Sequence, residues 1–117
     1  MNTSTLNKLP QAIADQSYKL LALDTQIRDA REIIAKFESE IDSAIAFGEF
    51  KNDSQRKAAK AQMSAENAEL QATLQTLRGL TEDRDQQAIE LSLLRDRFSI
   101  AKLEARERIA KLESLTA

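Results

Sequence analysis

The sequence predicts an all-α protein built as a long antiparallel helical hairpin of coiled-coil type. Apolar residues recur at heptad spacing along most of the chain, and 31% of the 117 residues are charged. Only two glycines and one proline interrupt this pattern. Such a composition is typical of long helices and coiled coils. We expect one coiled-coil domain over residues 1–117, with a helix at 10–47, a turn at 48–53 and a helix at 54–115.

The first helix carries a heptad pattern along its whole length. Its a positions are Leu6, Ile13, Leu20, Ile27, Ile34 and Ile41, and its d positions are Leu9, Gln16, Leu23, Ala30, Phe37 and Ala44. Only Gln16 among these twelve residues is polar. Spacing sustained over this length indicates a coiled-coil seam. The helix is expected to begin near Pro10, because the first helical turn does not need the N–H that proline lacks.

A turn is predicted where the heptad pattern stops. Gly48 is expected to end the first helix in the left-handed conformation. Asn52, Asp53 or Ser54 is expected to cap the next helix by accepting hydrogen bonds from its free N–H groups. We expect the two phenylalanines that flank the turn, Phe47 and Phe50, to close the end of the helix pair.

The second helix has a less regular pattern. Its main apolar row contains Met63, Leu70, Leu77, Leu91, Phe98 and Leu112, with Arg84 and Ala105 as exceptions. Companion residues follow the row by four positions early on (Leu74, Ala88) and by three later (Leu94, Ala101, Leu115). The pattern therefore predicts a change of phase near residues 80–90.

Gly79 leaves two interpretations open. A helix end at Gly79 would give a three-helix bundle. A continuous helix is favoured, because a reversal there would leave about one loop residue where helix connections usually take about 2–8.

The unequal helix lengths predict a partner surface. A first helix that begins at Pro10 reaches only to about residue 92 of the second. In that region the second helix has two apolar stripes, one of Leu91, Leu94, Phe98 and Ala101 and one of Ile89, Leu93, Ile100 and Leu103. A helix that is apolar on two sides needs more than one neighbour. We expect a homo-oligomer, with two hairpins forming a dimeric four-helix bundle, or a different protein partner. The predicted interface residues are Leu91, Leu93, Leu94, Phe98, Ile100 and Leu103.

The residue types argue against an enzyme. The chain has no histidine and no cysteine, and therefore lacks the commonest general base, the commonest metal ligand and any thiolate. Glu66 and Glu69 would share a helical face and are the best candidates for a Mg²⁺ site, but a solvated surface is the simpler interpretation. We predict no catalytic residues, no metal and no cofactor.

A basic cluster at the predicted turn gives the alternative function. Lys51, Arg56, Lys57 and Lys60 lie close together in the sequence and are candidate contacts for nucleic-acid phosphates. The formal net charge is −2, so no overall field favours nucleic acid. A nucleic-acid accessory role is therefore the second hypothesis.

The N-terminal residues and the apolar runs bear on location. Residues 1–6 lack the basic and apolar regions of a signal peptide. No apolar run approaches the roughly 18 residues that would span a bilayer. We expect a cytoplasmic protein that does not enter a membrane.

Two segments in roughly the second half of the chain are Asn52-Asp53-Ser54-Gln55-Arg56-Lys57-Ala58-Ala59 and Ile89-Glu90-Leu91-Ser92-Leu93-Leu94-Arg95-Asp96-Arg97-Phe98. Together they resemble small helical coiled-coil proteins of bacterial and phage genomes. The resemblance carries no activity with it. It implies an accessory role near phage or mobile-element DNA metabolism.

Overall fold

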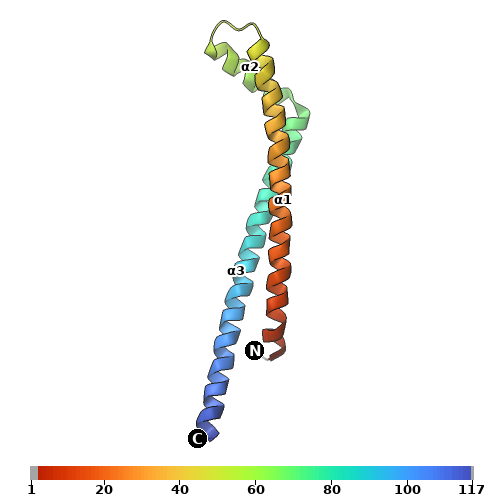
Figure 1. Ribbon diagram of the computed structural model, residues 1–117. Coiled ribbons are helices and arrows are strands. Elements are labelled where there is room, and N and C mark those ends of the chain that lie inside the picture. The colour runs from red at the N-terminus through yellow and green to blue at the C-terminus, as the bar shows by residue number, and fades with distance from the viewer. Residues whose placement is uncertain (1–2, 117) are drawn as a thin grey trace. The chain divides into compact units, whose positions relative to one another are not determined.

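The computed structural model describes residues 3–116. Within this range it consists of three helices and no strand: α1 (Thr3–Phe47), α2 (Asp53–Glu66) and α3 (Ala68–Thr116) (Figure 1). The predicted all-α class is confirmed. Residues 1 and 2, which belong to the stretch in which we expect no signal peptide, and residue 117 lie outside the described range.

The helices pack into two compact units, and each is described by itself. The first unit comprises the chain up to Ala22 and from Arg84 onward, and the second comprises Leu23–Asp83. In the first unit α1 packs antiparallel to α3, with Gln16 bonded to Gln87 and Leu6 close to Ala105. In the second unit α1 also packs against α3, and Leu70 lies in a core with Ile34 and Ile41.

The heptad pattern predicted the packed face of α1. Of its twelve a and d residues, six are buried and five are half-buried. The buried residues are Leu9, Gln16, Ile27, Ala30, Ile34 and Ile41. Ala44, near the end of the helix, is the exposed one. In each unit the predicted seam is therefore the packed face of α1.

Helix α1 begins earlier than predicted. It starts at Thr3 and contains Pro10 in its interior. A proline there removes one hydrogen bond to the carbonyl of Leu6 and costs about 3 kcal/mol. Leu9 is buried and Leu6 is half-buried, and burying a leucine is worth about 1.5–3 kcal/mol. Packing of these two residues offsets the cost of the proline. The prediction that the helix begins near Pro10 did not take this packing into account.

The turn between α1 and α2 differs from the prediction in two details. Gly48 does not have a positive φ, so the expected left-handed helix end is wrong. Its lack of a side chain matters for space, because a Cβ at Gly48 would collide with the ring of Phe50. Phe47 is exposed and does not close the helix pair. Asn52 is the cap, since its side chain accepts a hydrogen bond of 2.9 Å from the backbone N–H of Gln55.

The predicted helix 54–115 is interrupted at Asn67. The backbone N–H of Asn67 donates to the carbonyl of Met63 at 3.1 Å and ends α2. Its side-chain oxygen accepts from the N–H of Leu70 at 3.0 Å and begins α3. The side chain of Gln71 bonds to the carbonyl of Ser64 at 2.9 Å across the break. One asparagine thus satisfies backbone groups of two helix ends, which stabilises a break within an apolar row that looks continuous.

Helix α3 follows one unbroken heptad. Its a positions from Leu70 to Ala105 and its d positions from Thr73 to Ala101 are all buried or half-buried. The predicted change of phase near residues 80–90 is therefore wrong. It arose because three of the inward positions are polar, namely Thr73, Arg84 and Gln87.

Helix α3 also runs through Gly79, so the alternative break at that residue is wrong. Nothing lies within 4 Å of a Cβ built at Gly79. A glycine in a helix interior costs up to about 1 kcal/mol relative to alanine. We expect Gly79→Ala to raise the free energy of unfolding by about 0.5–1 kcal/mol, measured by urea denaturation followed by circular dichroism. Gly48→Ala is the matched control and should give no such gain, because its Cβ meets Phe50.

Candidate partner interface

The structure divides the six predicted interface residues into two groups. Leu91 is buried, and Leu94 and Phe98 are half-buried. Leu93, Ile100 and Leu103 are exposed. The first three face α1 within the first unit and are not free to meet another chain. The candidate interface is therefore the exposed group.

The predicted overhang of the second helix was too long, because it assumed that α1 begins at Pro10. Helix α1 extends to Thr3 and covers α3 well beyond residue 92. Ala101 is only 3% exposed, and Leu6 lines a shallow hollow together with Ala105 and Leu112. The stripe of Leu91, Leu94, Phe98 and Ala101 belongs to the packed helix pair for this reason.

The second stripe stays in solvent. Ile89, Leu93, Ile100 and Leu103, here called the α3 stripe, are 43–61% exposed. At roughly 100° per residue these four positions fall on one side of α3, and Leu91 and Ala101 fall on the opposite side. The end of α3 within the first unit is therefore apolar on two opposite faces, of which α1 covers one. Ile89 was not among the six predicted interface residues, although its spacing to Leu93 and Ile100 places it in the same stripe.

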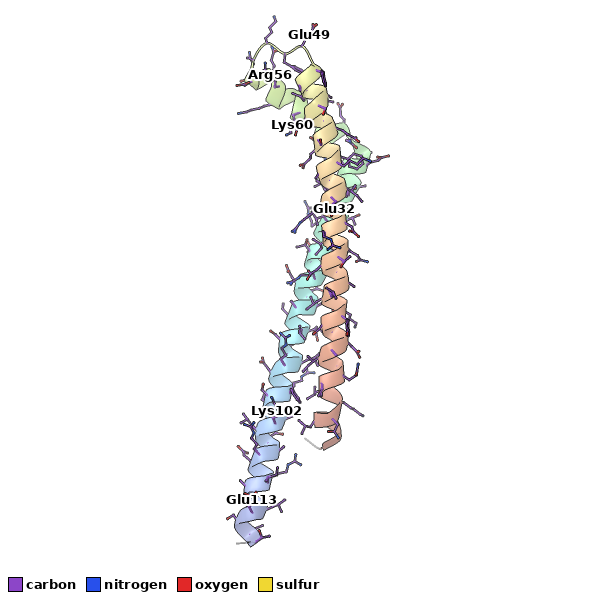
Figure 2. All side chains as sticks on the ribbon, in the orientation of Figure 1. Glu32, Glu49, Arg56, Lys60, Lys102 and Glu113 are labelled. Atoms are coloured by element: carbon purple, nitrogen blue, oxygen red, sulfur yellow. The ribbon has the colours of Figure 1, made fainter. Side chains whose placement is uncertain are left out.

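A cation lies over the ring of Phe98, the one aromatic residue of α3. The Nζ atom of Lys102 is 4.6 Å from the centre of the Phe98 ring, and the two residues are one helical turn apart (Lys102 is labelled in Figure 2). This is a cation–π contact, in which the face of the ring attracts the positive charge. Phe98 is thus engaged within α3 as well as half-buried, which separates it further from the α3 stripe.

The four candidate phosphate contacts have unequal surroundings. Arg56 pairs with Asp53 at 2.6 Å, and Lys60 pairs with Asp42 of α1 at 2.7 Å (Arg56 and Lys60 are labelled in Figure 2). In the part of the chain that the structure describes, Lys51 and Lys57 have no ion-pair partner. Two of the four cations are thus partly neutralised by carboxylates, which weakens their attraction for phosphate.

The Lys60–Asp42 pair connects α2 to α1. The hydrogen bond that the Lys60 ammonium donates to Asp42 and the negative charge of Asp42 raise the pKa of Lys60 above its usual value, and Glu38 adds to this effect. Both side chains are about half exposed, so solvent screens the pair. Helix α2 itself has no buried residue.

The two glutamates considered for Mg²⁺ lie on different helices. Glu66 is the last residue of α2 and accepts a hydrogen bond from Gln62, whereas Glu69 lies in the first turn of α3. The break at Asn67 separates them, so they do not share a helical face. Among residues 3–116, no group of three or more acidic, histidine or cysteine side chains is arranged to hold a metal ion.

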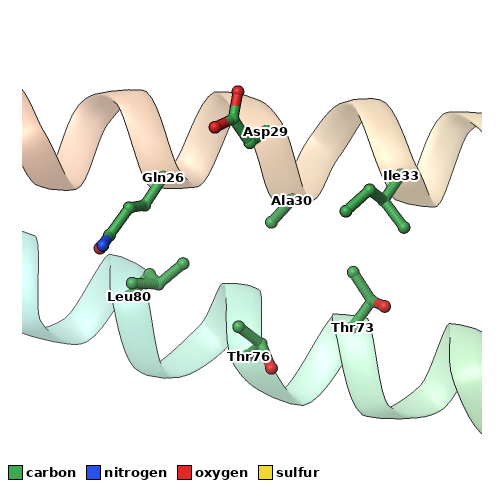
Figure 3. Close-up of a pocket in the computed structure, with 7 residues that line it drawn as sticks. All are labelled: Gln26, Asp29, Ala30, Ile33, Thr73, Thr76 and Leu80. Carbon is green, nitrogen blue, oxygen red and sulfur yellow. The ribbon is translucent and has the colours of Figure 1, made fainter.

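A groove of about 460 Å³ lies between α1 and α3 in the second unit (Figure 3). Its lining residues are Gln26, Asp29, Ala30 and Ile33 from α1 and Thr73, Thr76 and Leu80 from α3. The groove is open and shallow, and its one charged lining residue is Asp29. Figure 3 shows that the carboxylate of Asp29 does not point at either threonine hydroxyl. The groove thus lacks the paired groups that nucleophilic catalysis uses.

Comparisons with known proteins add no assignment. A scan against protein-family models found no match, and neither the curated proteins nor the solved structures contain a significant one. None of the helices in residues 3–116 combines the length and the apolar character that crossing a membrane requires.

Proposed function

We propose that this chain is a non-enzymatic oligomerisation or adaptor protein that binds partner chains through the α3 stripe. The observation that supports the proposal is the exposure of Ile89, Leu93, Ile100 and Leu103 on the side of α3 that α1 leaves uncovered. Burying one such side chain is worth about 1.5–3 kcal/mol. Four aligned residues therefore supply a substantial driving force for association through a further helix.

The nature of the stripe favours a helical partner. Its members are spaced by four, seven and three residues, which is the spacing of a coiled-coil seam. An amphipathic helix would place its own apolar residues between them. The cations near the turn support the nucleic-acid alternative less well, because Arg56 and Lys60 already have carboxylate partners.

Sedimentation equilibrium tests the proposal. We expect the purified chain to have at least twice its monomer mass of 13.1 kDa. A Leu93→Lys/Ile100→Lys variant should return to the monomer mass and keep its helical circular dichroism, because both side chains are exposed and neither contributes to the α1–α3 packing. If the chain is an adaptor, the wild type should recover a protein partner from cell lysate even after nuclease treatment. The Leu93→Lys/Ile100→Lys variant should fail to recover this partner.

Leu115→Lys is the matched control. Leu115 is an exposed leucine of the same helix that lies outside the α3 stripe. It should change neither the mass nor the recovery. A wild-type monomer that recovers no protein partner would rule the proposal out, and a partner whose recovery collapses on nuclease treatment would favour the nucleic-acid hypothesis.

A further inference from the structure

A row of alternating charges borders the α3 stripe. Glu90, Arg97, Glu104 and Lys111 are each seven residues apart and lie along one flank of the stripe. Glu90 and Glu104 directly follow the stripe residues Ile89 and Leu103 in the sequence. Within residues 3–116 none of the four forms an ion pair. The other flank, at the equivalent spacing, consists of Ser92, Ser99, Arg106 and Glu113.

We infer that the partner of the α3 stripe is the same stripe of a second copy of this chain, packed antiparallel. The inference rests on the proposed function and identifies the partner. The two-fold axis of an antiparallel pair is perpendicular to both helices and places the same flank of each copy on the same side of the interface. The charged row of one copy therefore faces the charged row of the other, running in the opposite direction. Reversal places Glu90 opposite Lys111 of the second copy and Arg97 opposite Glu104, and each pairing occurs twice.

A parallel pair does not give this match. In a parallel arrangement the charged row faces the other flank, where two of the four residues are serines. Lys111 would then meet Arg106, which is a like-charge contact. The alternation of charge is therefore complementary to itself only when the second helix runs in the opposite direction.

The same register sets the apolar contacts. Ile100 lies opposite Leu103 of the second copy, and Leu93 lies opposite Ala110. In this register the two acidic residues in line with the stripe, Asp96 and Glu107, lie opposite each other in the two copies and oppose association. This contact gives the register a specific signature, because Asp96→Lys would turn two repulsive contacts into attractive ones.

Exchanging the charges at residues 97 and 104 tests the role of the charged row, with the dimer dissociation constant measured by sedimentation equilibrium. Arg97→Glu and Glu104→Arg should each raise the dimer dissociation constant about tenfold, since each makes two like-charge contacts across the axis. The double variant R97E/E104R should restore the wild-type value, and Asp96→Lys should lower it. Arg95→Glu is the control, because it has the same charge change as R97E outside the row and should have little effect. Failure of the swap to restore association would overturn the antiparallel register.

Cross-linking tests the direction of the helices independently. The chain has no cysteine, so introduced ones report unambiguously. A mixture of Leu93→Cys and Ala110→Cys chains should form the mixed disulfide on oxidation. Leu93→Cys alone should not, because its two copies would lie roughly 25 Å apart at 1.5 Å per residue, and a disulfide needs Cα atoms within about 7 Å. Homotypic disulfides at residue 93 would show a parallel pair and overturn the inference.

The results separate this inference from the proposed function. A dimer that is lost in the Leu93→Lys/Ile100→Lys variant but does not respond to the charge swap overturns the register and leaves the function standing. A monomeric chain that captures a different protein through the α3 stripe overturns self-pairing alone. Restoration by R97E/E104R together with the mixed disulfide establishes the antiparallel second copy as the partner.

Discussion

Leu70→Ala is expected to lower the free energy of unfolding of the second unit by about 2–5 kcal/mol. Leu70 is 2% exposed and is the most completely buried large side chain among the described residues. It packs in a core with Ile34 and Ile41, and Phe37, Ile45 and Leu77 border this core. Removing three methylene-sized groups there leaves a cavity, and the surrounding side chains and helices can close it only in part by moving closer together. Because a domain of this size is stable by only about 5–15 kcal/mol, the loss is a large part of the total.

The measurement should separate the two units. Urea denaturation gives the loss of stability, and amide hydrogen exchange shows where it occurs. We expect faster exchange in residues 23–83, because the deleted side chain belongs to that unit. Leu74→Ala is the control: Leu74 lies one turn away on the same helix but is 38% exposed, and it should cost much less. Equal losses at the two positions would contradict the core assigned to Leu70.

The sequence predicted the elements whose side chains repeat regularly. Leucine and isoleucine every seven residues identified the packed face of α1, because the heptad period reports directly which side of a helix is buried. The break at Asn67 was missed for the same reason: Met63, Leu70 and Leu77 maintain the period across it. A few hydrogen bonds, those of Asn67 and the one from Gln71 to Ser64, distinguish that break from a continuous helix, and polar residues facing solvent look the same in a sequence.

The candidate interface was half predicted. The spacing of Ile89, Leu93, Ile100 and Leu103 revealed a second apolar stripe, but the choice between the two stripes depended on where α1 begins. Pro10 suggested a late start, whereas burial of Leu9 favoured an earlier one. A proline in a helix interior costs about 3 kcal/mol, and burying leucine side chains gains a similar amount. The gain depends on tertiary packing, which helix propensities do not include.

The one buried polar residue in the α1 seam has a defined partner. The side-chain amide of Gln16 donates to the side-chain oxygen of Gln87 at 2.6 Å and to its backbone carbonyl at 2.9 Å. Both residues are at d positions, and Gln16 is 7% exposed. A buried polar pair in a seam favours the register in which both members are satisfied, at a cost in stability compared with apolar residues. We infer that this pair fixes the alignment of α1 with α3 in the first unit.

Gln16→Ala is expected to cost about 1–3 kcal/mol, because it removes both hydrogen bonds that the buried Gln16 amide donates to Gln87. The double variant Gln16→Leu/Gln87→Leu should be as stable as the wild type or more so, since both polar groups are replaced by apolar ones. It should also lose the single register, and extra amide cross-peaks for residues of the first unit in an NMR spectrum would reveal this. Stability that falls in the double variant, or a spectrum with one set of peaks, would mean that the apolar residues of the seam fix the alignment by themselves.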